Sequence, residues 1–194
     1  MKLLHYLILD YLHELPAKFS QLISVDVDII FNMPKHELSK PDLLLQLDFM
    51  FESEYINLKC KNNDINKKPS DQKFDFEIYL TNLGGKVWEE AFKPNWNQFV
   101  LVEQDYLDKK NINIKIATIN LSYLYLILNS LGVKENKIHK LSPWHPVYWK
   151  LIKEAYSSNF VINEDDFNED VLLKYGEKWR KQWDFNASQL RLKE

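Results

Sequence analysis

The densest group of charged side chains is a run of carboxylates near the C-terminal end. In the segment 163–170, NEDDFNED, five of eight residues are acidic, namely Glu164, Asp165, Asp166, Glu169 and Asp170. Carboxylates grouped in this way speed association with a cationic partner, through an attraction that salt weakens. They also suit the start of a helix, because the helix dipole favours negative charge there. The run is therefore either a solvated helix entry or a surface that captures a basic protein; it lacks the oxygen spacing and central glycine of a calcium loop.

Tryptophan is the second residue type that stands out. The six tryptophans come in pairs along the predicted elements: Trp88 with Trp96, Trp144 with Trp149, and Trp179 with Trp183. Each falls on or near a predicted apolar face, which favours core packing. Tryptophan is also favoured at binding hot spots, so some of them are candidate interface anchors. The candidate contact surface combines the acidic run with Trp179 and Trp183.

The remaining reactive residue types form no recognisable catalytic, metal or cofactor motif. Cys60 is the single cysteine, so a disulfide framework or a cysteine zinc site within one chain is excluded. His139 and His145 are six residues apart across a proline-containing turn, without a carboxylate at a diagnostic offset. No serine lies in a nucleophile-elbow pattern. We therefore expect no cofactor and no metal, while an enzyme of unrecognised type stays open because active sites assemble in space.

Composition sets the class of protein. The 194 residues are 45% hydrophobic, which is enough for one large domain or two small ones. The formal net charge of −3 does not call for a nucleic-acid partner. The N-terminal stretch MKLLHYLILDYLHEL is interrupted by charged residues and lacks an export-signal pattern, and no apolar run reaches the roughly 18 residues of a membrane span. We therefore expect a cytoplasmic protein without a membrane segment.

A strand followed by a helix with a glycine pair is the most strongly patterned region. Residues 74–80 alternate, with Phe74, Phe76, Ile78 and Leu80 on one face, which indicates a half-buried strand. Thr81 or Asn82 can cap the next helix, whose predicted apolar face carries Leu83, Val87 and Ala91, widened by Trp88 and Phe92. Gly84-Gly85 lies where anions bind, but it lacks the other residues of a phosphate loop. The pair therefore indicates close backbone packing.

The other elements complete a mixed pattern. Before residue 74 we predict a helix over 3–15, a strand over 25–31, a helix starting at Ser39-Lys40-Pro41, a strand over 55–61 and a polar hairpin tip over 62–73. After residue 96 we predict strands over 99–102, 112–117 and 159–162, and helices over 121–130, from Ser142-Pro143 to Ala155, and from Leu172 to Trp183. The order predicts an α+β fold, with halves 1–96 and 97–194 that pack on each other or form one continuous domain.

The first half resembles a winged-helix domain over about residues 1–95. The stretch DLLLQLDFMFESEYINL is similar to a recognition helix that runs into the first wing strand. The stretch IYLTNLGGKVWEEAF is similar to the second wing strand, a Leu-Thr-x-x-Gly turn and the following helix. The resemblance implies a DNA-binding regulator with residues 42–54 in the major groove. That segment carries four carboxylates and neither lysine nor arginine, which opposes phosphate binding.

The hypothesis that fits these features best is a non-enzymatic protein-binding module. The overall character resembles that of bacterial immunity proteins, which bind and neutralise a cognate toxin, often a basic nuclease, inside the producing cell. The resemblance implies occlusion: carboxylates steer the toxin, aromatic residues make the buried contact, and the toxin's active site is covered. A winged-helix DNA-binding regulator is the first alternative and an enzyme of unrecognised type the second.

Overall fold

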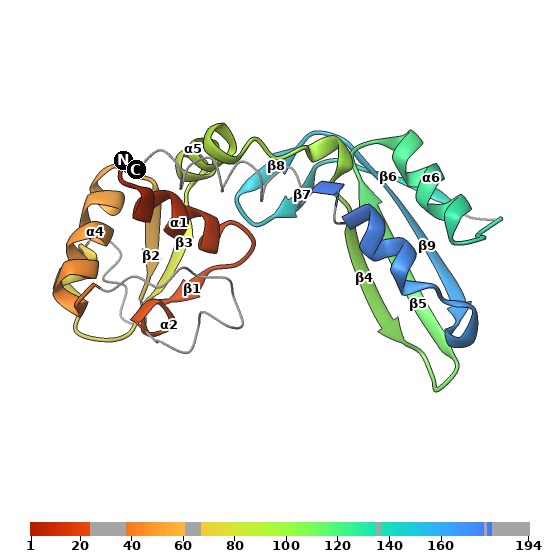
Figure 1. The fold of residues 1–194 in the computed structure, drawn as a ribbon, viewed down its shortest axis with the longest axis horizontal. Helices are drawn as coiled ribbons and strands as arrows, with labels where there is room; N and C mark the ends of the chain where they lie inside the picture. Colours follow the sequence, from red (N-terminus) through yellow and green to blue (C-terminus); the bar gives the residue numbers. More distant parts are fainter. Residues whose placement is uncertain (24–37, 61–66, 135–136, 177, 180–194) are drawn as a thin grey trace. The chain divides into compact units, whose positions relative to one another are not determined.

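The chain has a mixed α+β fold divided into two compact units (Figure 1). The computed structural model describes residues 1–23, 38–60, 67–134, 137–176 and 178–179. Of these, unit 1 contains Met1–Phe92 and Val147–Lys150, and unit 2 contains Lys93–Pro146 and 151–179. The predicted division after residue 96 therefore differs from the observed one, which follows Phe92 and assigns residues 147–150 to unit 1.

Unit 1 joins a small antiparallel sheet to several helices. In chain order its elements are α1 (Leu3–Leu12), β1 (Ala17–Lys18), α2 (Phe19–Ile23), α4 (Lys40–Glu52), β2 (Ile56–Lys59), η1 (Pro69–Asp71), β3 (Glu77–Leu80) and α5 (Asn82–Phe92). The strands lie in the order β1-β3-β2, and Ile78 of β3 faces Ala17 on one side and Leu58 on the other. Those three side chains are buried, so the alternation of each strand places its apolar residues in one core.

The start of α4 follows the predicted capping chemistry. The Ser39 side chain accepts a hydrogen bond from the Asp42 backbone N–H at 3.3 Å, and Pro41 lies in the first turn. The helix ends before Ser53, and β2 follows and pairs with β3 as predicted, with Asn57 opposite Tyr79. The strand predicted over 25–31 and the first part of the predicted hairpin tip lie outside the described residues.

The joint between β3 and α5 confirms the packing role of the glycine pair but corrects the helix face. A Cβ atom on Gly84 would lie 1.9 Å from the Tyr55 carbonyl oxygen, and one on Gly85 would lie 2.0 Å from the Trp149 ring. Because the backbone approaches its neighbours here, the buried face of α5 runs through the two glycines, Trp88 and Phe92. Trp88 and Phe92 of the predicted face are buried, but Leu83 is 44% exposed and its place on that face is wrong.

Unit 2 is built on a four-stranded antiparallel sheet. From residue 93 onward the elements are η2 (Trp96–Gln98), β4 (Leu101–Tyr106), β5 (Asn111–Thr118), α6 (Leu121–Ser130), β6 (Ile138–Leu141), β7 (Trp144–Val147), β8 (Lys150–Ile152), β9 (Ala155–Asn163), η3 (Glu164–Asp166) and helical residues 169–176 and 178–179. The strand order is β4-β5-β9-β6, and β7 pairs with β8 separately. One sheet face is covered by α6 and the last helix, which pack on Ile112, Ile114 and Ile116.

Three predictions in this unit are confirmed and one is wrong. The strand over 112–117 and the helix over 121–130 are present, and Gly132 ends the latter with a φ of 73°. The helix predicted from Ser142-Pro143 to Ala155 is instead β7, β8 and the start of β9. Pro146 opposes a helix there because it has no backbone N–H to donate. The strand predicted over 159–162 is present as part of the longer strand β9.

The two kinds of glycine environment predict opposite effects of alanine. We expect Gly84→Ala to lower the free energy of unfolding by about 1–3 kcal/mol, because the new methyl group meets rigid backbone. Gly176 is helical and a Cβ there meets nothing within 4 Å, so Gly176→Ala should raise stability by up to about 1 kcal/mol. Chemical denaturation followed by circular dichroism measures both. An unchanged midpoint for Gly84→Ala would contradict the packing role.

Candidate functional site

The predicted acidic run is exposed and anchored at one end of unit 2. Glu164, Asp165 and Asp166 form η3, which Asn163 caps by accepting a hydrogen bond from the Asp165 N–H at 3.0 Å. All five carboxylates of the run, including Glu169 and Asp170, are exposed. The Glu164 N–H donates to the Lys110 carbonyl at 2.7 Å, which ties η3 to the turn between β4 and β5. The run is therefore a fixed part of the surface.

The neighbouring turn, residues 107–110, adds another carboxylate. Asp108 accepts hydrogen bonds from the side chain of Asn111 and from the N–H groups of Lys110 and Asn111. These bonds, that of the Asn111 side chain first, lower the pKa of Asp108, so it is ionised at neutral pH. We call residues 107–110 and 164–170 the acidic end. It holds six carboxylates and only two lysines.

The two predicted aromatic anchors do not add to this surface. Trp179 is only 4% exposed, and its ring lies 5.0 Å from Phe99 and 6.0 Å from Trp96 between ring centroids. Trp183 lies outside the described residues. The structure instead exposes Tyr106, which is 66% exposed, beside Leu107 at the end of β4. The signal in the sequence was the break in alternation at Glu103-Gln104-Asp105, which is typical of an edge strand.

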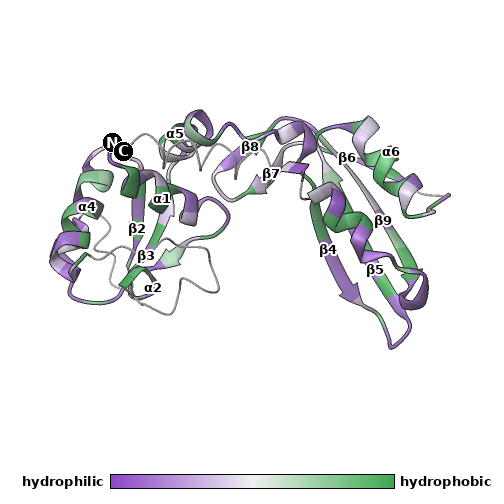
Figure 2. Cartoon of the chain, viewed as in Figure 1, coloured by the Kyte–Doolittle hydropathy of each residue, from purple (hydrophilic) through white to green (hydrophobic). Residues whose placement is uncertain are grey.

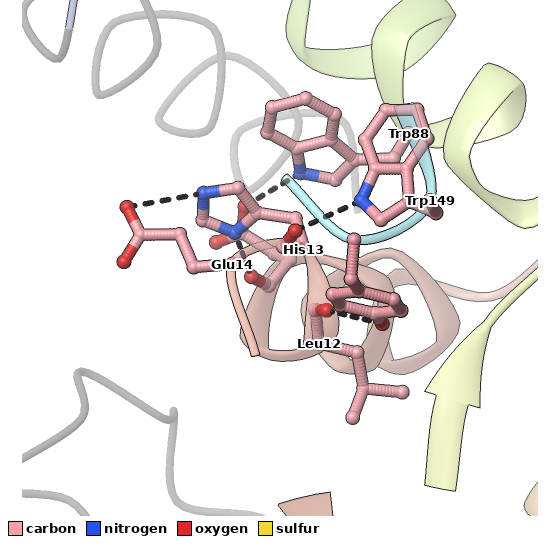
Figure 3. A network of polar contacts seen from close by, with 7 residues as sticks. Leu12, His13, Glu14, Trp88 and Trp149 are labelled. Carbon is pink, nitrogen blue, oxygen red and sulfur yellow. Dashed lines mark hydrogen bonds and ion pairs between the residues drawn. The ribbon is translucent and has the colours of Figure 1, made fainter. Parts of the chain in front are cut away.

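A second polar cluster lies in unit 1 at the end of α1 (Figure 3). The Trp88 ring stacks on His13, with centroids 4.6 Å apart, and its Nε1–H donates to the Asp10 carboxylate at 2.8 Å. His13 Nδ1 bonds to the Asp10 carbonyl, and its Nε2 lies 3.5 Å from the Glu14 carboxylate. Such a histidine–carboxylate arrangement is a candidate for proton transfer.

The hydrogen bonds around this cluster nevertheless have a structural role, because they cap the C-terminal end of α1. Trp149 Nε1–H donates to the His13 carbonyl at 2.8 Å, and the Tyr148 hydroxyl donates to the Leu12 carbonyl at 2.7 Å. These are terminal carbonyls of α1, which lack partners within the helix. The same Tyr148 oxygen accepts from the Leu80 N–H at 2.7 Å, and burial raises the pKa of Tyr148. No group of three metal-ligating side chains occurs anywhere among the described residues.

His5 is a third buried titratable group, and its contacts define its protonation. Nδ1 accepts from the Lys2 backbone N–H at 3.1 Å, so the proton is on Nε2, which lies 3.0 Å from the Gln46 side-chain oxygen. The ring also stacks on Phe49, with centroids 4.8 Å apart. Burial lowers the pKa of His5, and a position in the first turn of α1 further disfavours a cation.

The outer face of α4 is acidic and partly apolar. Leu45 and Phe49 are 61% and 43% exposed, and the exposed Asp42 and Glu52 lie on either side of them at helical spacing. Glu52 forms an ion pair with Lys68. Asp48 points inward instead and accepts a hydrogen bond from the Ser70 N–H at 2.9 Å. The segment that the winged-helix resemblance assigns to a DNA groove thus offers carboxylates and hydrocarbon.

Comparison with known proteins identifies no relative. No protein-family model, no curated protein and no solved structure matches the chain. Within the described residues, every helix is too short or too polar to cross a lipid bilayer.

The neutral state of His5 predicts a pH dependence of stability. Because the pKa is lower in the folded chain than its ordinary value near 6.5, the unfolded chain binds more protons between these two values. Stability should therefore fall as the pH drops below about 6.5. We expect His5→Gln to reduce this loss, whereas the exposed control His139→Gln should retain it. Urea midpoints at pH 7 and pH 5 test this, and equal losses in both variants would contradict it.

The bond from Trp149 predicts a second effect on stability. Trp149→Phe leaves the His13 carbonyl without its donor in a buried site and removes part of the ring that packs on Gly85. We expect a loss of about 1–3 kcal/mol in the free energy of unfolding. Tyr148→Phe is the matched comparison, because it removes only a hydroxyl and should cost a similar amount through the Leu12 carbonyl and the Leu80 N–H. Two variants with wild-type denaturation midpoints would exclude a structural role for the cluster.

Proposed function

We propose that this chain is a non-enzymatic protein-binding module whose partner is a basic protein. The observation that carries the proposal is the acidic end of unit 2, where six exposed carboxylates are gathered against two lysines. The hydrogen bond from Glu164 to the Lys110 carbonyl fixes the two segments side by side, so their charges act together. A patch of one sign raises the encounter rate with a partner of opposite sign.

The proposed mechanism is occlusion, in the manner of immunity proteins. The acidic end attracts the basic face of a toxin in the cytoplasm, and the bound chain then covers the surface that the toxin needs for its own substrate. A nuclease suits this scheme, because its substrate is a polyanion and its active face is basic. No catalytic group of the chain is required, since the inhibition is steric.

Unit 1 supports protein binding more than DNA binding. The sheet order β1-β3-β2, with a helix before β1 and α4 before β2, supports a winged-helix-like arrangement as part of this proposal. The exposed face of α4, however, presents Asp42 and Glu52 beside Leu45 and Phe49. Asp42 would repel a phosphate backbone and Glu52 is already paired with Lys68, whereas an apolar pair with a polar rim is typical of protein contacts.

Charge reversal in η3 tests the proposed surface. The proposal requires a gene for a basic protein next to that of this chain, and the probe is that protein, purified and injected over the immobilised chain. We expect Asp165→Lys with Asp166→Lys to slow association about 10-fold in 10 mM salt, where the Debye length is about 30 Å. Near 1 M salt, where that length is about 3 Å, the difference should vanish. The dissociation rate should change less than the association rate.

The matched control is Glu90→Lys, which reverses an exposed charge in unit 1. It should leave the association rate close to that of the wild type. An unchanged rate for the η3 variant at low salt would remove the acidic end as the docking surface. A neighbouring basic protein that fails to bind the wild-type chain would overturn the immunity proposal itself.

A further inference from the structure

β4 is an edge strand of unit 2, and its hydrogen-bonding direction can be assigned. It lies at one end of the order β4-β5-β9-β6 (Figure 1). The Leu107 N–H donates to the Asn111 carbonyl of the opposite strand at 3.0 Å. Since backbone groups of successive residues point to opposite sides of a strand, the odd-numbered residues of β4 face β5. The N–H and C=O groups of Val102, Gln104 and Tyr106 therefore point away from the sheet.

This outer edge carries no hydrogen bond to any part of the chain that the structure describes. The residues from Glu103 to Tyr106 are exposed, and Figure 2 shows most of β4 as hydrophilic. The strand is six residues long, so three donors and three acceptors form a regular row. Such a row is a template for one more strand.

Charge decides against a second copy of the chain as that strand. A second copy can form hydrogen bonds only with Val102, Gln104 and Tyr106, whose backbone groups point outward. An antiparallel β4 from that copy can therefore align in three central registers, which keep the two strands largely overlapped. They place Glu103 opposite Glu103, Glu103 opposite Asp105, or Asp105 opposite Asp105 of the other copy. Like charges directly opposite each other destabilise a strand pair. Each register therefore opposes self-association at this edge.

The same two carboxylates favour a basic strand. The register with β5 places Glu103 across from Lys115, to which it is 2.8 Å away, and Asp105 across from the uncharged Asn113. Both carboxylates lie on the sheet face opposite to α6, while Val102 and Tyr106 lie on the helix-covered face. An added strand would therefore meet acidic groups on one face and apolar groups on the other.

We propose that β4 is completed by an extended segment of the basic partner, with lysine or arginine opposite Glu103 and Asp105 and apolar residues alternating between them. This inference rests on the proposed function and adds its docking geometry. β4 leads directly into the turn 107–110, and Asn111 and Asn163 pair next to η3. A segment on this edge thus continues toward the acidic end, so one basic partner can contact both.

The probe is a synthetic capped peptide, Thr-Lys-Val-Lys-Val-Lys-Thr, added to the full chain labelled with ¹⁵N. We expect chemical-shift changes and slower hydrogen exchange at the amides of Val102, Gln104 and Tyr106. In the proposed register the valine N–H groups face β4 and the lysine N–H groups face solvent. N-methylation of both valines should weaken binding at least 10-fold, whereas N-methylation of two lysines should weaken it less than 3-fold. A Glu-Val-Glu counterpart should not bind.

A variant of the chain provides the complementary test. Gln104→Pro removes an outward N–H that the sheet does not use, as edge strands tolerate, and Gln104→Thr retains it. We expect only the proline variant to lose binding. If proline disrupts β4, its loss of binding is not informative. The comparison of the two methylated peptides on the wild-type chain then tests strand addition without any change to β4.

The outcomes separate this inference from the proposed function. Equal weakening by the two methylation patterns, or no change at the β4 amides with the unmodified peptide at millimolar concentration, overturns strand addition. Capture of the basic neighbour through η3 would then stand by itself. Binding of the peptide that persists in Asp165→Lys with Asp166→Lys supports an edge that acts independently of those carboxylates.

Discussion

The organisation of unit 1 depends on which groups donate hydrogen bonds to the backbone carbonyls at the C-terminal end of α1. A buried helix end leaves carbonyl groups that cost free energy unless a donor reaches them. The donors here are Tyr148 and Trp149, more than a hundred residues away in the sequence. Gly85 is small enough to admit the Trp149 ring, and Gly84 admits the Tyr55 backbone. Gly85 and residues 147–150 thus pack together at the end of α1, while Gly84 serves the contact with Tyr55.

A structural feature could be predicted from the sequence where neighbouring residues determine it, and could not where distant residues determine it. The cap at Ser39, the alternation of β5 and the stop at Gly132 are written in a few neighbouring residues, and these predictions were confirmed. The helix predicted from Ser142 to Ala155 is wrong. The spacing of its apolar residues fits a helix and also fits two short strands, so the spacing alone does not distinguish them. The hydrophobicity pattern places Leu83 on the buried face of α5, and it fails there because it gives no weight to Gly84 and Gly85, which are the residues that face the core.

The candidate site also has parts that the sequence predicts and parts that it does not. Five carboxylates within eight residues cannot be buried without partners, so their exposure follows from composition alone. Tryptophan carries no such constraint, because the spacing of Trp179 is the same whether it faces solvent or packs on Phe99. The open edge of β4 depends on the order of four strands, which come from between Leu101 and Asn163. No local pattern contains that order, although three consecutive polar residues within β4 were consistent with an edge.

The acidic character of β4 has two consequences that are usually treated separately. Charged side chains on an edge strand protect it from pairing with copies of itself. The same charges set the chemistry of any strand that can pair, because specificity is a difference between the affinities for right and wrong partners. Glu103 and Asp105 raise the free energy of the three central antiparallel self-pairing registers, and the same charges favour pairing with a basic segment. An edge that resists aggregation in this way is already selective, and a partner needs only an alternating basic strand to use it.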